Sequence, residues 1–484
     1  MDERPGHDLQ ERIRMEALPP LQAKIVERVL SGGNALVVMP TGGGKSLCYQ
    51  LPALVQQTDG NGGVALVFSP LIALMEDQVA ALRKKGVRAT YINSTLGRNE
   101  REKRQRGIAD GAYEIVYATP ERMGRPGFPD ALDACPGGVR LLAIDEAHCI
   151  SKWGHDLRPA YRDVGAFRER LGDPVTIALT ATATAPVRTD IRGVLGCTED
   201  DMPLFASGID RPNLDLNVRE VWDDEEKAAA LAEVAGSHRG TGIAYFTLIK
   251  DLDRMVPVVK KALPDCALEV YHGNLDPREK KRVYRRFIDA TPDERLVLLA
   301  TNAFGMGVDK ADLRFIVHTQ IPGSVEAYYQ EVGRAGRDRL PSRCELLYAQ
   351  DDLAIQQEFI RWQNPSADVM VRVATAAERR AEVEFDEDDL RVDALGKSGQ
   401  SGLVQYALIE LERLGVVTPV YVGPDATGRY RFAKPLDQDD VSPDEIESKH
   451  QRDLERLLQV VRLTKTPDVR AFVLDYFELE PTPL

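Results

Sequence analysis

The 484-residue sequence contains little cysteine, few aromatic residues and no long apolar run. Its six cysteines are widely spaced, and the closest pair, Cys135 and Cys149, is fourteen positions apart. This spacing provides neither a disulfide framework nor a CxxC metal motif. Apolar runs such as Ala35–Met39 and Val64–Phe68 are far shorter than the ~18 residues that span a bilayer, and the first residues are charged. We therefore expect a protein of the reducing cytoplasm that is neither membrane-spanning nor secreted.

A surplus of basic residues is also absent. The chain has 62 Lys and Arg against 76 Asp and Glu, which gives a formal net charge of −14. Residues 366–484 hold 15 of the basic and 24 of the acidic residues and so contribute −9 of this charge. This balance argues against a protein that coats nucleic acid by bulk electrostatics, although it permits a local basic groove.

Short apolar runs typical of buried strands alternate with helical patterns twice along the chain. The first series is Ala35–Met39, Val64–Phe68, Glu114–Tyr117, Leu141–Ile144 and Val175–Leu179; the second is Gly242–Phe246, Leu268–Tyr271, Leu296–Leu299, Phe315–His318 and Glu345–Tyr348. Such alternation indicates parallel α/β sheets. We therefore predict an α/β fold with two tandem lobes, residues 1–206 and 207–350, and a smaller helix-rich region at residues 351–484.

A glycine-rich segment follows the first predicted strand and precedes a helix that begins near Leu47. It consists of Thr41, Gly42, Gly43, Gly44, Lys45 and Ser46. Glycines in this setting let backbone N–H groups face a β-phosphate, Lys45 adds a positive charge, and the Ser46 hydroxyl is a ligand for Mg²⁺. The strict pattern has glycine where this chain has Met39. The segment predicts a site for ATP with Mg²⁺.

Two adjacent carboxylates, Asp145 and Glu146, follow the predicted strand Leu141–Ile144. Open α/β sheets bind their ligands at the carboxyl ends of strands. Asp145 is a candidate Mg²⁺ ligand, and Glu146 is a candidate for polarising the attacking water. The pair predicts that the nucleotide is hydrolysed and not only bound.

Further motifs follow in a fixed order along the chain. The set is Met39–Ser46, Ser69–Gln78, Ala118–Arg122, Asp145–Asp156, Ala178–Thr184, Ala300–Asp309 and Gln330–Asp338. Over roughly residues 18–350 it resembles the RecQ family of superfamily 2 helicases, whose motor consists of two RecA-like lobes. The resemblance implies an ATP-dependent DNA helicase that moves 3′ to 5′ on single-stranded DNA and unwinds duplex in repair and recombination. A DNA-stimulated ATPase that translocates without separating strands is the alternative.

The resemblance also assigns roles at the nucleotide. Gln22 is expected to read the adenine edge, Asp309 to lie near the ribose and Gln330 near the γ-phosphate. Arg334 and Arg337 are three positions apart, so both guanidinium groups are expected on one helix face that points across the cleft between the lobes. A guanidinium there stabilises the charge that develops on the γ-phosphate oxygens.

Two groups of residues are expected to contact single-stranded or forked DNA. The first, in a segment similar to the aromatic-rich loop of the family, is Lys152, Trp153, His155 and Arg158. Trp153 is expected to stack on a base, with a buried structural role as its alternative. The second group, at predicted strand ends, is Ser69, Thr119, Thr301 and Asn302, which are candidates for backbone contacts. A single-strand-binding or repair protein is a candidate partner, and the nucleoid is the expected location in a prokaryote.

The C-terminal region departs from the family pattern. Most relatives continue into a zinc-binding helical platform, whereas this chain has no cysteine after Cys344. Thr466–Phe477 resembles the platform helix, and we predict a zinc-free remnant held by apolar packing. The packing residues are expected to be Leu454, Leu457, Leu458, Phe472, Leu474 and Phe477. Ser401–Gly415 and the strand–turn–strand pattern Val416–Phe432 predict a winged helix, for which duplex binding and a packing or partner-docking role remain equally open.

Overall fold

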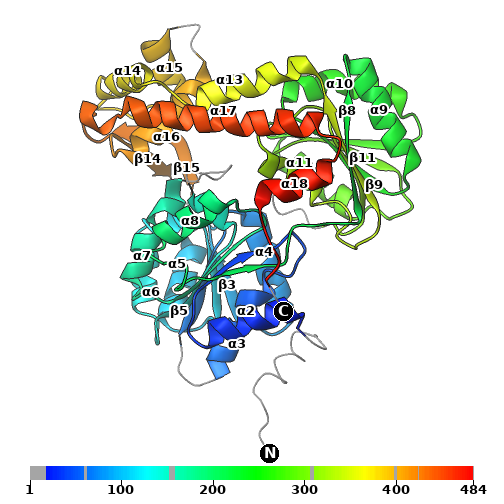
Figure 1. Cartoon of the computed structure of the whole chain (residues 1–484). Helices are drawn as coiled ribbons and strands as arrows, with labels where there is room; N and C mark the ends of the chain where they lie inside the picture. The colour runs from blue at the N-terminus through cyan, green and yellow to red at the C-terminus, as the bar shows by residue number, and fades with distance from the viewer. Residues whose placement is uncertain are drawn as a thin grey trace, which may run out of the picture.

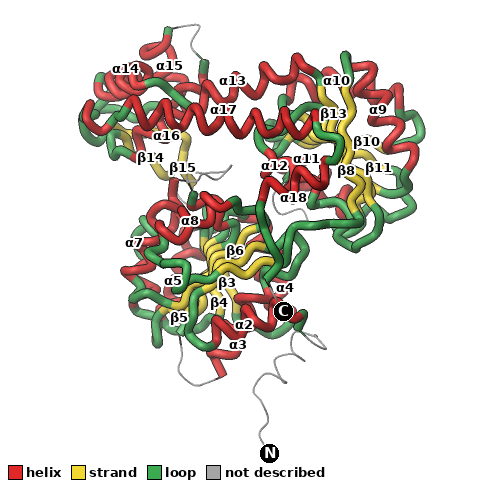
Figure 2. Tube along the Cα trace, viewed as in Figure 1, coloured by secondary structure: helices red, strands yellow, loops and turns green. Residues whose placement is uncertain are grey.

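The computed structural model describes residues 18–58, 63–151, 159–305, 310–396, 400–422 and 425–482. Two α/β lobes are followed by an arm of helices and one hairpin (Figure 1). Lobe 1 lies at the bottom of the view, lobe 2 at the upper right and the arm at the upper left (Figures 1 and 2). The predicted class, two tandem parallel α/β lobes with C-terminal helices, is confirmed.

Lobe 1 is built on a seven-stranded parallel sheet with the order β3-β4-β2-β5-β6-β1-β7. Its strands are β1 (Ala35–Val38), β2 (Val64–Phe68), β3 (Ala89–Ile92), β4 (Ile115–Ala118), β5 (Val139–Ile144), β6 (Val175–Thr180) and β7 (Leu204–Ala206). Its helices are α2 (Pro20–Leu30), α3 (Leu47–Thr58), α4 (Ile72–Lys84), α5 (Arg98–Ala109), α6 (Phe128–Asp133), α7 (Val164–Arg170) and α8 (Ala185–Val194), with the short turns η1 (Pro120–Arg122), η2 (Ala147–Ile150) and η3 (Pro159–Asp163).

Strand β1 shows why the central strands read as uninterrupted apolar runs. Leu36 and Val38 belong to the apolar cluster on one face of the sheet, whereas Ala35 and Val37 belong to the cluster on the other. All four side chains are fully buried. Since successive residues point to opposite faces and helices cover both, every position of β1 has to be apolar.

Lobe 2 repeats this design with a six-stranded parallel sheet of order β10-β11-β9-β12-β13-β8. Its strands are β8 (Leu214–Glu220), β9 (Thr241–Phe246), β10 (Ala267–Tyr271), β11 (Leu296–Thr301), β12 (Leu313–His318) and β13 (Ser342–Tyr348). Its helices are α9 (Asp224–Ser237), α10 (Ile249–Ala262), α11 (Pro277–Ile288) and α12 (Val325–Val332), followed by the short turn η4 (Gln350–Asp352).

Three strands, β3, β7 and β8, were not predicted from the sequence, and all three lie at sheet edges. In β8 only Leu214 is buried, and polar residues occupy alternate positions of its first half. An edge strand has one neighbour and less cover, so its sequence is not required to be a continuous apolar run.

The arm has an apolar core of its own. It consists of α14 (Ala367–Glu378), α15 (Glu387–Leu395), α16 (Ser401–Arg413) and the antiparallel pair β14 (Val417–Val422) and β15 (Asp425–Phe432). Two long helices, α13 (Leu353–Gln363) and α17 (Pro443–Lys465), run side by side between the arm and lobe 2 (Figure 1), and the short turn η5 (Gln438–Asp440) precedes α17. The predicted helix and hairpin are present.

The C-terminal helices pack against lobe 2. Leu457 of α17 and Phe477 of α18 (Val469–Phe477) are buried in its core, and Leu454, Phe472 and Leu474 pack at the edge of that core. The expected burial of Leu458 is wrong: this residue is 47% exposed, because it lies on the outer face of α17. Within the described ranges, no helix is long and apolar enough to cross a membrane.

Candidate nucleotide site between the lobes

The phosphate loop connects β1, in the interior of the lobe 1 sheet, to α3. Gly42 and Gly44 have φ values of +80° and +82°, a backbone region that glycine adopts without steric cost. The Gly43 N–H donates to the Pro40 carbonyl at 3.0 Å, and the Leu47 N–H donates to the Gly44 carbonyl at 3.1 Å. The loop is thus a tight turn that ends at the N-terminus of α3, as the sequence predicted.

Lys45 faces the two carboxylates at the end of β5. Its ammonium donates to the Met39 carbonyl at 3.0 Å, which holds the side chain along the loop. Burial lowers the pKa of Lys45, whereas the carboxylates of Glu146 and Asp145 raise it. The structure therefore brings together residues that are about a hundred positions apart in sequence.

Asp145 and Glu146 lie where β5 ends. The Asp145 N–H continues the pairing of β5 with β2 by donating to the Phe68 carbonyl at 2.8 Å. Burial and the neighbouring Glu146 charge raise the pKa of Asp145 to about 7, while Lys45 and a hydrogen bond from Ser69 act in the opposite direction. Two partly buried carboxylates are thus held together beside the Lys45 ammonium group.

Glu146 adopts a left-handed backbone conformation with φ of +50°, which is uncommon for a residue other than glycine. Its Oε2 atom is buried and has no hydrogen-bond donor within the described part of the chain. The imidazole Nδ1 of His148 lies 3.4 Å from this oxygen and 3.0 Å from the hydroxyl of Thr180, at the end of β6. Sequence reasoning assigned no role to His148, although the residue stands inside the motif that contains Asp145.

The donor set fits a nucleotide with Mg²⁺. Mg²⁺ prefers oxygen ligands, which the Ser46 hydroxyl and the Asp145 carboxylate can supply beside the phosphate loop. Two adjacent, partly buried carboxylates favour a neighbouring cation, and the Oε2 of Glu146, which has no hydrogen-bond donor in the described part of the chain, can accept a hydrogen bond from water.

Arg337 of lobe 2 lies against the phosphate loop of lobe 1. A methyl group built on Gly42 would lie 3.6 Å from both Cγ and Cδ of Arg337, so the arginine stem packs against the phosphate loop. Arg337 also contributes to the lowered pKa of Lys45. The two lobes therefore place a lysine, two carboxylates and an arginine at one site between them.

The prediction that Arg334 and Arg337 share a helix face is wrong. Helix α12 ends at Val332 with Gly333 as its C-cap, and Gly336, with φ of +54°, turns the chain between the two arginines. Arg334 is buried and donates from Nη1 to the Gly305 carbonyl inside lobe 2. Only Arg337 is placed against the phosphate loop.

The other residues expected at the nucleotide are placed differently from one another. Gln22 of α2 is buried and donates from Nε2 to the Gly43 carbonyl at 2.8 Å, so its amide contacts the phosphate loop. Gln330 lies near the end of α12, one turn before the arginines. Asp309 lies outside the described residues.

The candidate DNA contacts lie at the carboxyl ends of strands in both lobes. Ser69 and Thr119 follow β2 and β4, and Thr301 ends β11; all three side chains are buried. Asn302 is exposed. Lys152, Trp153, His155 and Arg158 lie outside the described residues. The DNA contacts of all eight residues stay predictions.

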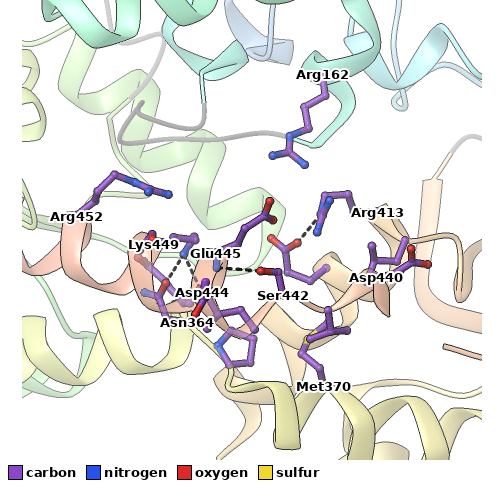
Figure 3. Close-up of a pocket in the computed structure, with 17 residues that line it drawn as sticks. Arg162, Asn364, Met370, Arg413, Asp440, Ser442, Asp444, Glu445, Lys449 and Arg452 are labelled. Carbon is purple, nitrogen blue, oxygen red and sulfur yellow. Dashed lines mark hydrogen bonds and ion pairs between the residues drawn. The ribbon is translucent and has the colours of Figure 1, made fainter. Parts of the chain in front are cut away.

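A cavity of about 570 Å³ lies between lobe 1 and the arm, away from the phosphate loop. Figure 3 shows Arg162 of lobe 1 pointing toward Arg413 of α16 and the first turns of α17. Four basic and four acidic side chains line the cavity, and its Arg413 and Lys449 bind Glu410 and Asn364. Because these charges balance, the cavity offers no net attraction to a nucleic-acid backbone.

The arginines of the arm are also paired with acidic residues or backbone. Arg431 binds the carboxylate of Glu384, and Arg429 donates to the Glu384 carbonyl at 3.2 Å. Duplex binding and partner docking by this region therefore remain open. No group of three or more His, Cys, Asp or Glu residues in the described ranges is placed to hold a metal ion.

The structure has two tandem parallel α/β lobes, and an arginine of the second lies beside the phosphate loop of the first. This is the architecture of a superfamily 2 helicase motor. Residues 19–190 match the DEAD/DEAH box helicase family, and residues 226–339 match the helicase conserved C-terminal domain. The ATP-dependent DNA helicase RecQ of Bacillus subtilis is 44% identical over 329 residues, which are 68% of this chain and 53% of the relative.

A second relative, the probable ATP-dependent DNA helicase RecS of Bacillus subtilis, is 38% identical over 362 residues, which cover 75% of this chain and 70% of RecS. The chain belongs to the RecQ family of helicases. It nevertheless spans only about half the length of the RecQ relative. Among solved structures, that of the DUF1998 helicase MrfA bound to DNA and AMPPNP has a TM-score of 0.58 at 22% identity and covers 91% of this chain and 63% of MrfA. This likeness concerns the fold.

Proposed function

We propose that this protein is an ATP-dependent DNA helicase that translocates 3′ to 5′ on single-stranded DNA and unwinds duplex DNA. The observation that carries the proposal is the meeting of Lys45, the Asp145–Glu146 pair and Arg337 at one cleft between two lobes. Hydrolysis at such a cleft changes what holds the lobes together. A bound strand that contacts both lobes is then moved by their closing and opening.

Each residue has a part in the proposed chemistry. Magnesium bound with the nucleotide neutralises charge on the phosphates, and Ser46 and Asp145 are the residues to hold it. Lys45 binds the β- and γ-phosphates, and Glu146 accepts a hydrogen bond from the attacking water and orients it. Arg337 stabilises the negative charge that develops on the transferred phosphoryl oxygens.

Membership of the RecQ family and the names of its relatives support DNA as the ligand. Single-stranded and forked DNA are the proposed substrates, with the carboxyl ends of the strands in both lobes as the track. Repair and recombination, a single-strand-binding or repair protein partner, and a place in the cytoplasm at the nucleoid of a prokaryote are proposed on the same basis.

Steady-state ATP hydrolysis with and without single-stranded DNA, followed by strand displacement on duplexes with a 3′ or a 5′ tail, tests the proposal. We expect DNA to stimulate hydrolysis and only the 3′-tailed duplex to be unwound. Stimulated hydrolysis without displacement of either duplex would favour the alternative, a DNA-stimulated translocase.

A further inference from the structure

The segment that joins the two lobes binds the loop that presents Arg337. We call residues 207–213 the linker and residues 333–337 the finger loop. Arg211 of the linker donates from Nη1 to the Gly333 carbonyl at 3.4 Å and from Nη2 to the carbonyls of Ala335 and Gly336 at 3.0 and 2.7 Å. One guanidinium group thus binds three of the five residues of the finger loop.

A second linker residue reinforces this contact. Asn213 donates from Nδ2 to the Gly336 carbonyl at 2.9 Å and to the Leu340 carbonyl at 3.0 Å. A Cβ atom on Gly336 would lie 2.5 Å from Asn213 Nδ2, so the close approach of linker and loop requires glycine at this position. The linker and the finger loop fit together as one unit.

The finger loop follows the end of a helix, and its Gly336 carbonyl also accepts from the Arg339 N–H at 2.9 Å. Carbonyls after the last turn of α12 have no helical N–H partner, and they carry the partial negative charge of the helix C-terminus. A guanidinium satisfies several of them at once with charge-assisted hydrogen bonds in one plane. Lysine, with a single ammonium, lacks this fork and can satisfy only some of these carbonyls.

The linker is itself fixed from the other side. Arg470 of α18 donates to the Asp210 carboxylate at 2.5 Å and to the Leu214 carbonyl, and the Tyr329 hydroxyl of α12 donates to the Ile209 carbonyl. Residues on both sides of Arg211 are therefore anchored to lobe 2. The position of its guanidinium, and with it that of the finger loop, is determined by lobe 2 and its C-terminal helix.

We infer that Arg211 is a positioning residue for ATP hydrolysis: by binding the backbone carbonyls of the finger loop, it holds Arg337 against the phosphate loop. The inference rests on the proposed function, in which Arg337 acts on the transferred phosphoryl group. Arg337 directly follows Gly336, whose carbonyl accepts from both Arg211 and Asn213. A shift of this carbonyl is transmitted to the Arg337 side chain.

The test uses Arg211→Ala and Arg211→Lys in the full chain. We expect Arg211→Ala to lower kcat for ATP roughly 10- to 100-fold, because a small misplacement of a reacting group has effects of this size. KM for ATP and affinity for ADP should change less than about twofold, because the nucleotide is bound by lobe 1. Arg211→Lys should restore part of kcat.

Arg168→Ala is a matched control. Arg168 also donates from its guanidinium to a backbone carbonyl, that of Leu195, but it bonds Thr176 near the start of β6, at the edge of the sheet opposite the phosphate loop. We expect it to lower the melting temperature without changing kcat. If Arg211→Ala instead lowers the melting temperature and raises KM while Arg211→Lys restores neither, the role is structural and the inference is overturned.

A double-mutant cycle separates this inference from the proposed function. If Arg211 acts through Arg337, then Arg211→Ala has no further effect on kcat in an Arg337→Ala background. If the wild-type chain hydrolyses ATP but the two substitutions lower kcat independently, so that their fold-losses multiply in the double variant, the positioning role is overturned and the proposed function stands. A wild-type chain that does not hydrolyse ATP with single-stranded DNA would overturn the proposed function, and the positioning role with it.

Discussion

The two walls of the candidate nucleotide site, one from each lobe, are built in different ways. On the lobe 1 wall, Lys45 and Asp145 are positioned by short segments at the ends of the interior strands β1 and β5, and the turn depends on glycines within the same loop. On the lobe 2 wall, Arg337 lies in a turn that is supported by Arg211, more than a hundred positions away in sequence. The first wall is held by residues that are close to it in sequence, whereas the second depends on a residue that is far from it in sequence.

This difference has a consequence for motion. Strand ends in a buried sheet are among the most stable parts of an α/β lobe, whereas a turn held by side-chain hydrogen bonds opens at lower cost. We therefore expect the lobe 1 wall to bind nucleotide in much the same way throughout the cycle. The lobe 2 wall is the part whose arrangement changes, and the following predictions test that contrast.

Removal of the lobe 2 side chain should have the largest effect on the rate. We expect Arg337→Ala to lower hydrolysis by ~10³- to 10⁵-fold, the range found for arginine fingers in phosphoryl transfer. Nucleotide affinity should change little, because the phosphates are bound by lobe 1. Steady-state ATP hydrolysis and equilibrium binding of a fluorescent nucleotide measure the two quantities. The exposed Arg339, two positions further along, is the control: Arg339→Lys should keep full activity. A large loss of affinity in Arg337→Ala would contradict the division of labour between the walls.

Changes in the lobe 1 wall should separate binding from chemistry. Glu146→Gln is expected to reduce hydrolysis by ~10²- to 10⁴-fold while nucleotide affinity is kept, since the residue acts on water. Lys45→Ala is expected to lose both, since the ammonium binds phosphate oxygens. The same two assays measure these effects. Undiminished turnover in either variant would show that the site has been assigned to the wrong residues.

The contrast between the walls also explains what could be predicted from the sequence. The phosphate loop and Asp145–Glu146 were predictable because each follows a buried strand within a few residues. The contacts that position Arg337 could not be predicted. Arg211 and Asn213 bind backbone carbonyls of the finger loop, and a backbone carbonyl places no requirement on the residue type that carries it. The expected helix face for Arg334 and Arg337 failed because α12 ends at Val332, before both arginines, and Gly336 turns the chain between them.

The fold follows the same rule. Strands covered on both faces were predicted to within a few residues. The edge strands β3, β7 and β8 were missed, because β3 and β7 have only four and three residues and β8 alternates apolar with polar residues in its first half. The return of the chain end to lobe 1 was not predictable either. There, the Ala206 N–H donates to the Thr482 hydroxyl at 2.8 Å, and the Thr482 N–H donates to the Ala206 carbonyl at 2.7 Å. No motif marks this contact between residues 276 positions apart.

The segment that returns to lobe 1 offers a test of how the walls are held together. Leu479 packs against the apolar clusters of both lobes. Leu479→Ala should lower the free energy of unfolding by about 1 kcal/mol, because it removes a partly buried apolar contact, and should lower the melting temperature by about 2–4 °C. Leu458→Ala, a change at an exposed leucine of α17, should leave it within about 1 °C. Calorimetry of both variants measures the difference, and equal shifts would mean that the segment does not join the lobes.

The smallest expected effect is that of metal removal. Structural zinc needs four ligands, chiefly Cys and His, near one point, and its binding supplies ~10 kcal/mol or more of folding free energy. After Cys344 the only Cys or His in the sequence is His450. Its Nδ1 atom lies 4.0 Å from Oε2 of Glu447, and its side chain is partly exposed. Carboxylates alone rarely form closed structural zinc sites. The lobe 2 wall and the tail behind it would then depend on apolar packing and hydrogen bonds alone.

We therefore expect the purified, tag-free protein to contain no stoichiometric zinc and to melt at the same temperature, within about 1 °C, in excess chelator. The packing of Leu457, Val460 and Phe477 into the core of lobe 2 provides the stabilisation that a metal would otherwise supply. Elemental analysis and thermal melting with and without chelator measure both quantities, and a zinc-dependent protein of similar size verifies that the chelator acts. About one zinc per chain, or a large loss of stability in chelator, would show that a metal stabilises the fold and would overturn the packing account of the tail.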